Sequence, residues 1–149
     1  MALRVLLFAL LAAAVIQTGA EALAGGPVLP MALAPFLPDR LRPGMTMALS
    51  MVLLAALILP AAFHKGRAAR AGAALAAGGL GLNALVQAGA SVLAGTLVPG
   101  TLAGLVMMLP AALAVLWALG REGWPMAVLG AALSPAVLLA LWHLAALLP

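Results

Sequence analysis

The stretch 71–95, AGAALAAGGLGLNALVQAGASVLAG, decides the fold of this chain. It is longer than the ~20 apolar residues that cross the ~30 Å hydrocarbon core of a bilayer, and most of it is glycine and alanine. Ala73, Ala77 and Gly81 form a ridge of small residues at every fourth position, which lets another helix approach closely. We therefore expect a membrane-spanning helix here, at the centre of a helical bundle.

The composition of the whole chain agrees with a membrane protein. Of 149 residues, 67% are hydrophobic and only 7% are charged, whereas a soluble domain carries about a quarter charged residues. Open strands would leave backbone groups unpaired in lipid, so the spans must be helices. The sequence predicts an all-α polytopic bundle in a single domain, 1–149. The expected spans are about 5–23, 45–63, 71–95, 101–119 and 126–148.

The distribution of basic residues predicts the orientation of the spans. Five lie on the N-terminal side of the predicted bundle, namely Arg4, Lys65, Arg67, Arg70 and Arg121, and two lie on the other, Arg40 and Arg42. Because cytoplasmic loops carry the excess of Lys and Arg, the N-terminus should be cytoplasmic and the C-terminus outside. Trp117 and Trp124 would then mark the inner interface and Trp142 the outer one.

Prolines mark the irregular parts of the chain. The segment 24–44 contains Pro27, Pro30, Pro35 and Pro38 between apolar residues, a density that forbids a regular helix. We expect it to lie as a cap at the outer interface. Pro110 and Pro135 fall inside predicted helices, where they should cause kinks and free carbonyls that neighbouring groups must satisfy.

The first span has two readings. Arg4, the apolar run 5–16 and Ala22–Ala24 before Gly25 resemble a signal peptide with a small-residue cleavage site. Against this, Gln17 and Glu21 are unusual residues for the region before a cleavage site. We favour a retained helix, and the alternative of a cleaved signal peptide stays open.

Two polar pairs inside the spans form the candidate site. Gln17 and Glu21 follow Arg4 by 13 and 17 residues, and Asn83 and Gln87 follow Arg70 by the same offsets. Residues four apart share one face of a helix, and both pairs lie roughly 20 and 26 Å from their basic flanks. Partnerless polar groups in a membrane are costly, so we expect the first and third spans to touch along these residues. They could bind a ligand or cation, or they could only join the helices by hydrogen bonds.

Other residues suggest further sites of lower specificity. Lys65, Arg67 and Arg70 could bind anionic lipid head groups. His143 could ligate a haem or chlorophyll-type pigment, but it has no second ligand and should be solvated near the outer surface. With no cysteine and no zinc spacing we expect no metal site and no cofactor. The bases lack aromatic interleaving, so nucleic acid is not an expected partner.

The polar residues resemble the motifs of the HXXEE family of small bacterial membrane proteins. That family carries His-x-x-Glu-Glu in its first helix, Asn-x-x-x-His in a later one, and Tyr-x-Pro-Gly-x-x-Thr before the next. Here residues 17–21 keep only the final Glu21, and 83–87 keep Asn83 but have Gln87 for histidine. Residues 97–103 keep only Pro99-Gly100. The similarity runs from the first span to Pro110, with every motif degraded.

This resemblance implies a retained scaffold without the family's chemistry. The family's histidines and carboxylates suggest a membrane enzyme or a metal-binding protein. Glutamine at both histidine positions preserves hydrogen bonding but removes a general base and a metal ligand. We expect a non-catalytic protein of the bacterial inner membrane, in contact with the bilayer and serving as an accessory or scaffold subunit beside other membrane proteins. The alternative is a membrane enzyme or a small-ligand or cation-binding protein that uses Gln17, Glu21, Asn83 and Gln87.

Overall fold

The computed structural model describes residues 2–24, 35–64 and 66–148. Within these ranges it contains helices and no strand. The helices are α1 (Ala2–Leu23), α2 (Pro43–Phe63), α3 (Arg67–Ala94) and α6 (Gly123–Leu147), with one further span divided into α4 (Thr101–Ala103), η2 (Gly104–Met108) and α5 (Leu109–Leu119). All five spans are long and apolar enough to cross a membrane. The predicted all-α bundle is confirmed, and the chain is a multi-pass membrane protein.

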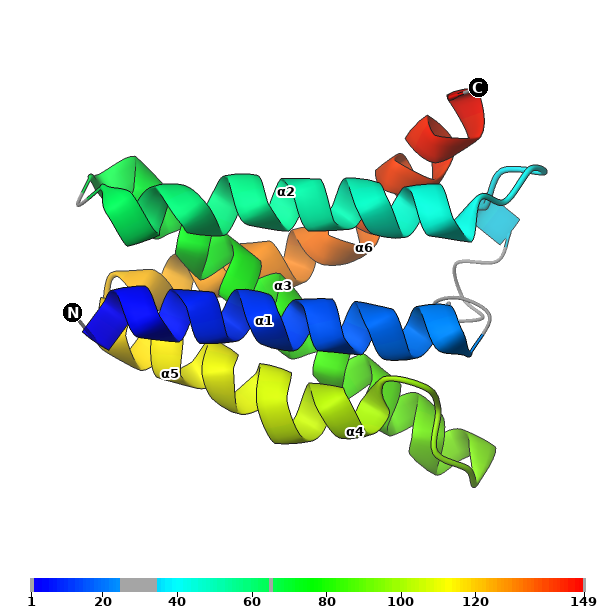
Figure 1. Ribbon diagram of the computed structural model, residues 1–149, viewed down its shortest axis with the longest axis horizontal. Coiled ribbons are helices and arrows are strands. Elements are labelled where there is room, and N and C mark those ends of the chain that lie inside the picture. The colour runs from blue at the N-terminus through cyan, green and yellow to red at the C-terminus, as the bar shows by residue number, and fades with distance from the viewer. Residues whose placement is uncertain (1, 25–34, 65, 149) are drawn as a thin grey trace.

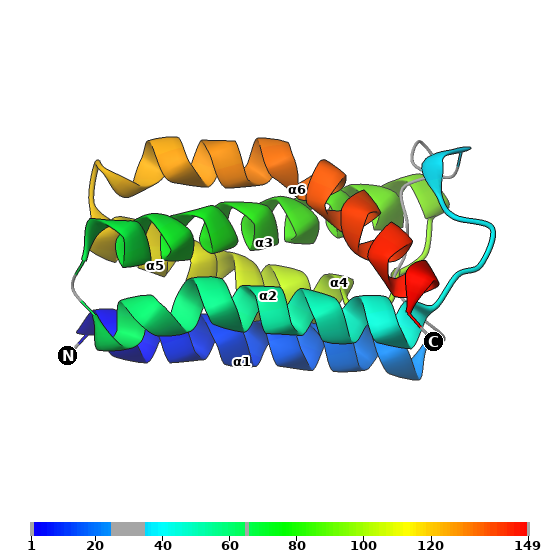
Figure 2. The same cartoon turned by 90° about the horizontal axis from the view of Figure 1, so that it is seen from above.

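The third span is the centre of the bundle, as its small residues indicate. α1 and α2 run side by side in opposite directions, and α3 passes behind them diagonally (Figure 1). The view from above shows α6 on the far side of α3 from α1 and α2 (Figure 2). The span α4–η2–α5 packs against both α1 and α3. Ala73 and Ala77 of the expected small-residue ridge are fully buried.

Two glycines allow α3 and α6 to cross in backbone contact. A Cβ atom added to Gly78 would lie 1.9 Å from the carbonyl oxygen of Ala127, and one added to Gly130 would lie 2.1 Å from that of Leu75. No side chain fits at either distance, so only glycine permits this crossing. The close approach that small residues favour in membranes is here realised between the third and fifth spans.

The predicted proline effects take two forms. Pro110 follows the π-helical turn η2, where the Leu109 N–H donates to the carbonyl of Gly104 instead of Leu105, so the helix widens just before the proline. Pro135 lies inside α6 and cannot donate to the carbonyl of Ala131. The Ser134 hydroxyl donates to that carbonyl at 2.9 Å, as expected for a carbonyl freed by proline.

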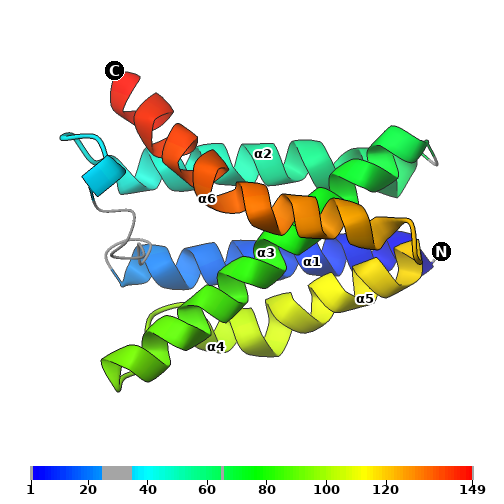
Figure 3. The same ribbon diagram turned by 180° about the vertical axis from the view of Figure 1, so that it is seen from behind.

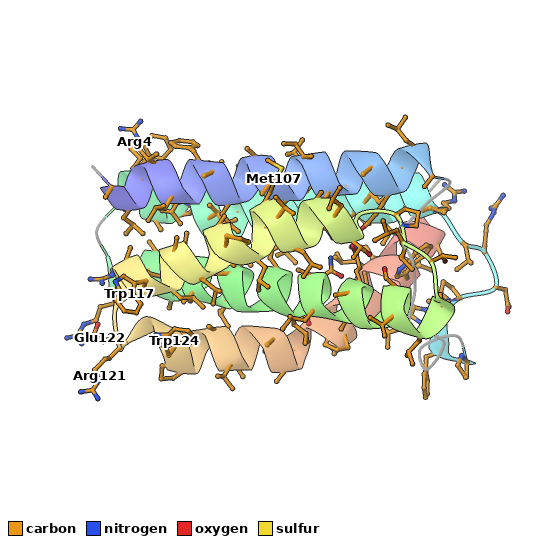
Figure 4. The ribbon with its side chains drawn as sticks, turned by 90° about the horizontal axis from the view of Figure 1, so that it is seen from below. Arg4, Met107, Trp117, Arg121, Glu122 and Trp124 are labelled. Atoms are coloured by element: carbon orange, nitrogen blue, oxygen red, sulfur yellow. The ribbon has the colours of Figure 1, made fainter. Side chains whose placement is uncertain are left out.

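The basic residues of the N-terminal side gather at one end of the bundle. Figure 4 shows Arg4, Arg121 and Glu122 at this end together with Trp117 and Trp124. The Arg4 guanidinium lies over the rings of Phe63 and Phe8, at 4.8 and 5.8 Å from their centroids. These cation–π contacts fix the start of α1 against the end of α2.

The predicted loop 64–70 is shorter than expected. α3 begins at Arg67, so Arg67 and Arg70 lie in its first turn instead of in a loop. An Arg70 Nη2 donates to the Leu119 carbonyl at 3.0 Å, which satisfies an unpaired group at the end of α5. The cation therefore joins two helices. Lys65 lies outside the described residues.

At the opposite end of the bundle, Trp142 does not lie where the sequence predicts it. Trp142 is 1% exposed, so it is not an interfacial ring, and its indole N–H has no partner among the described residues. Of the expected cap 24–44, residues 25–34 lie outside the described part, and α2 already begins at Pro43, a position that suits proline because its missing N–H needs no partner. The remaining segment reaches α6 through the Phe36 carbonyl, 2.9 Å from Nε2 of His143.

Candidate functional site

Glu21 lies at the centre of a buried polar cluster between α1 and α3. Its Oε1 accepts a hydrogen bond from Nε2 of Gln17 at 3.1 Å and another from Nε2 of Gln87. Glu21 is 7% exposed, and both glutamines are 3% exposed. The first and third spans therefore meet along three of the four polar residues that the sequence singled out.

The cluster continues the buried stripe of each helix. On α1 the inward positions are Leu7, Leu10, Ala13, Ala14, Gln17 and Glu21. On α3 they continue through Leu80, Ala84, Gln87 and Ser91. Each stripe has helical spacing and changes from apolar to polar at its last two positions. The polar groups thus replace the hydrocarbon core at one level of the bundle, where they must find partners among themselves.

Gly100 and Gly104 bring a third segment against the cluster. Gly100 has φ +85°, which favours glycine, and an added Cβ would lie 2.9 Å from Oε1 of Gln87 and 3.1 Å from Oε1 of Glu21. A Cβ on Gly104 would lie 3.2 Å from Oε1 of Gln17. The start of the span 101–119 therefore packs against the carboxylate, and its partial positive end stabilises a negative charge there.

A directed chain of hydrogen bonds holds this third segment in place. The Val98 N–H donates to Ser91 Oγ at 2.9 Å, and Thr101 Oγ1 donates to the Gln87 carbonyl at 3.3 Å. Ser91 Oγ and Thr101 Oγ1 are 2.7 Å apart. Because each hydroxyl has one proton, Ser91 must donate to Thr101. The chain positions Gly100 beside Glu21 and Gln87. Sequence reasoning missed Ser91 and Thr101, although Ser91 follows Gln87 by four residues and so extends its face.

Asn83 does not join the cluster. It is exposed, while Gln87 one turn later is buried, and no side-chain hydrogen bond to Asn83 occurs within the described residues. Both side chains nevertheless line the same cavity. The expected pairing of Asn83 with the first span is therefore replaced by a position on the wall of this cavity.

The cavity has a volume of about 370 Å³ and lies between α1, α2, α3 and α6. Gln17, Glu21 and Gln87 form one end of it together with Thr46 and Ser50 of α2. Apolar residues form most of the remaining wall, among them Leu53, Leu54, Leu57, Leu75, Leu80 and Leu138. Pockets of ~300–1,000 Å³ that combine apolar walls with a few polar groups are typical binding sites for small molecules.

Two atoms of the cluster lack partners within the described residues. They are Oε1 of Gln17 and Oε1 of Gln87, both fully buried. Each lies against a glycine of the third segment, and an amide oxygen left without a donor in an apolar environment costs free energy. The cluster therefore has an excess of hydrogen-bond acceptors: one carboxylate and two amide oxygens.

The remaining predicted sites lie elsewhere. His143 is exposed and far along α6, beside the Phe36 carbonyl. Arg67 and Arg70 line a second cavity of about 180 Å³ with Glu122 at the basic end. In the described part of the chain no three His, Cys, Asp or Glu side chains are grouped closely enough to hold a metal ion.

The segments of the three resembled motifs meet at one place. Glu21 accepts hydrogen bonds from Gln17 and Gln87, and Gly100 lies against Glu21 and Gln87. Comparisons with protein-family models, with curated proteins and with solved structures found no match to this chain.

Proposed function

We propose that this protein is a non-catalytic membrane protein that binds a small amphipathic molecule in the cavity between α1, α2, α3 and α6. One observation carries the proposal: an apolar cavity of about 370 Å³ ends at a buried carboxylate held by two amides. Such a cavity complements a molecule with an apolar body and one polar head. Five of the seven basic residues lie on the N-terminal side, which favours an N-terminus in the cytoplasm, and the resemblance to the HXXEE family favours the bacterial inner membrane.

The chemistry of the lining supports binding without turnover. Among the described residues of the cavity wall Glu21 is the only ionisable one, and its hydrogen-bond partners are the amides of Gln17 and Gln87. A carboxylate can act as a general base or a nucleophile, but such mechanisms pair it with a second catalytic group such as an imidazole, a thiol, a lysine or another carboxylate, and the described lining contains none of these. The glutamines at the histidine positions of the resembled HXXEE motifs can donate and accept hydrogen bonds but cannot exchange protons in this way.

The accessory-subunit hypothesis stays a prediction. An accessory subunit would contact its partner through helix faces of small residues. Gly78 and Gly130 lie on such faces, but they already contact each other's helices inside the bundle. A partner would have to use other surfaces. We therefore place ligand binding ahead of a scaffold role.

Native mass spectrometry of protein released from its membrane tests the proposal. We expect a small-molecule adduct in the natural chain that is lost in Ser50→Leu, because Ser50 lines the cavity and a leucine there fills part of it. Ala48→Leu is the matched control, since Ala48 is exposed on the same helix. Equal adducts in both variants, or a stoichiometric protein partner in place of a small molecule, would contradict the proposal.

A further inference from the structure

The cavity lies in a wedge between two helices that diverge. α3 and α6 cross in contact at Gly78 and Gly130, and beyond this crossing α6 turns toward α2 while α3 continues toward α4 (Figure 3). Cavity-lining residues of both helices follow the crossing, namely Leu82, Asn83, Val86 and Gln87 on α3 and Leu133, Ser134, Val137, Leu138 and Leu141 on α6. α1 and α2 close the other side of the wedge.

The open side of this wedge faces the membrane. Every exposed residue of the cavity lining comes from α3 or α6: Asn83, Val86, Leu133, Pro135 and Val137. The lining residues of α1 and α2 are buried or half-buried. These exposed positions lie inside the spans, away from the helix ends, so a molecule reaches the cavity sideways from the lipid.

The cavity is long, and the buried polar side chains of its lining, Gln17, Glu21, Thr46 and Gln87, belong to one end. Along α2 its lining runs from Thr46 to Leu57, a rise of about 16 Å at 1.5 Å per residue. Thr18 of α1 contacts Met51 of α2, with Oγ1 3.6 Å from the sulfur, so the polar end of α1 lies level with the first half of α2. Leu57 and Leu75 lie at the apolar end, close to the place where Gly72 of α3 approaches Leu57. This shape fits a single hydrocarbon chain with its head at Glu21.

The charge at the polar end selects the head group. Glu21 is the only acidic or basic side chain among the described residues of the cavity wall, and its two hydrogen-bond partners are neutral amides. The amide oxygens of Gln17 and Gln87 lie against Gly104 and Gly100, outside the cavity lining, so the carboxylate of Glu21 is the group that a head group would meet. A primary ammonium carries one positive charge and three donors, whereas a carboxylate head would meet a like charge in a low-dielectric environment.

We propose that the ligand is a single-chain amphiphile with a cationic ammonium head, which enters from the bilayer between α3 and α6 and pairs with Glu21. This inference rests on the proposed function, because it names the ligand class of the same cavity. It adds two claims, the positive charge of the head and the lateral route.

Three probes of equal chain length test the charge. Binding of dodecylamine, dodecanol and dodecanoate is measured on the full chain in phosphatidylcholine nanodiscs at neutral pH, with protein-free nanodiscs to subtract partitioning. We expect saturable binding of one dodecylamine per chain, weaker dodecanol binding and no dodecanoate binding. Glu21→Gln should weaken dodecylamine by about tenfold to a hundredfold, the range for a hydrogen bond to a charged group, and should weaken dodecanol much less, because an amide oxygen still accepts a hydrogen bond from a neutral hydroxyl. Glu122→Gln, the same substitution at an exposed site of the opposite end, should change neither.

The outcomes separate the inference from the proposed function. Equal affinity for dodecylamine and dodecanol in the natural chain, or tight dodecanoate binding, overturns the cationic head but leaves an amphiphile-binding cavity. Absence of saturable binding of all three probes overturns both. The comparison of probes on the natural chain does not depend on the folding of any variant.

A second pair of variants tests the route. Val86→Trp places a large ring on the exposed rim of the cavity, whereas Val92→Trp makes the same change on α3 at a site outside the lining. We expect Val86→Trp to slow dodecylamine association at least tenfold and Val92→Trp to leave it unchanged. Equal association rates in both variants overturn lateral access.

Discussion

At the scale of single residues, the polar level of the bundle is held by directed hydrogen bonds. Ser91 accepts from Val98 and donates to Thr101, which donates to the backbone of Gln87. The amide of Gln87 in turn donates to Glu21. The hydroxyl of Thr101 thus bonds to the residue whose amide bonds to Glu21. Its contribution can be tested without changing Glu21 itself.

Thr101→Val should destabilise the protein by about 1 kcal/mol, because it keeps the shape of the side chain but removes the acceptor of the Ser91 hydroxyl and the second hydrogen bond to the Gln87 carbonyl. The free energy of unfolding is measured by denaturation in mixed detergent micelles. Thr96→Val is the control: Thr96 is exposed in the preceding turn, so its loss should be within ~0.5 kcal/mol, the usual range for surface substitutions. A Thr101→Val variant as stable as the control would mean that the chain of hydrogen bonds contributes nothing.

Three of the four polar residues that the sequence singled out lie in the cluster, because helical spacing defines which side chains share a face. It could not separate Asn83 from Gln87. Residues four apart differ by about 40° around the helix axis at 3.6 residues per turn, and here that difference carries one side chain into the cluster and leaves the other exposed. The position of the neighbouring helices decides this, and spacing within one helix contains no such information.

At the scale of elements, the crossing of α3 and α6 is the closest helix contact of the described bundle. It depends on the absence of two side chains, Gly78 and Gly130. The wedge that contains the cavity begins at this crossing, so a change in the distance between the two helices also changes the site.

Gly78→Ala should therefore destabilise the protein by about 2–3 kcal/mol or more, since the added methyl cannot fit 1.9 Å from a carbonyl oxygen. Gly89→Ala, on the same helix with open space around it, should be neutral or stabilise by up to ~1 kcal/mol, because alanine is the better helix former. Thermal unfolding of the two variants in detergent, followed by circular dichroism, gives the midpoints to be compared. Equal midpoints would show that the helices do not cross in contact.

Proline positions were readable from the sequence, but their structural consequences were only partly so. A carbonyl freed by Pro135 was expected to find a donor, and the preceding Ser134 supplies it. The π-helical turn before Pro110 was not predicted, because a helix can absorb a proline by bending or by widening. Likewise Trp142 was expected at the interface from its distance along the helix, yet it is buried.

At the scale of the whole molecule, the two ends of the bundle have different chemistry. One end gathers Arg4, Arg121, Trp117 and Trp124 (Figure 4), and the other contains the segment 35–42 and the turn before Thr101 (Figures 1 and 2). The number and the bounds of the spans were predictable within a few residues, since length and hydropathy alone limit them. The packing of each helix against the others was not.

Reporter fusions test the orientation of these ends. A reporter inserted after Gly66 should be active in the cytoplasm, and one at the C-terminus should be active outside, because the excess of basic residues stays on the cytoplasmic side. Fusion after Gly95 serves as an internal control and should agree with the C-terminal one. A cytoplasmic reporter at the C-terminus would rule out five spans with a cytoplasmic N-terminus.

The backbone contact between α3 and α6 also has a consequence for biosynthesis. α6 is the last of the described helices to leave the ribosome, and it supplies one wall of the cavity and half of the crossing. A nascent chain that stops after α5 leaves Gly78 of α3 uncovered and the polar groups of Glu21 and Gln87 open to lipid on that side. The cavity is therefore complete only after α6 has packed against α3.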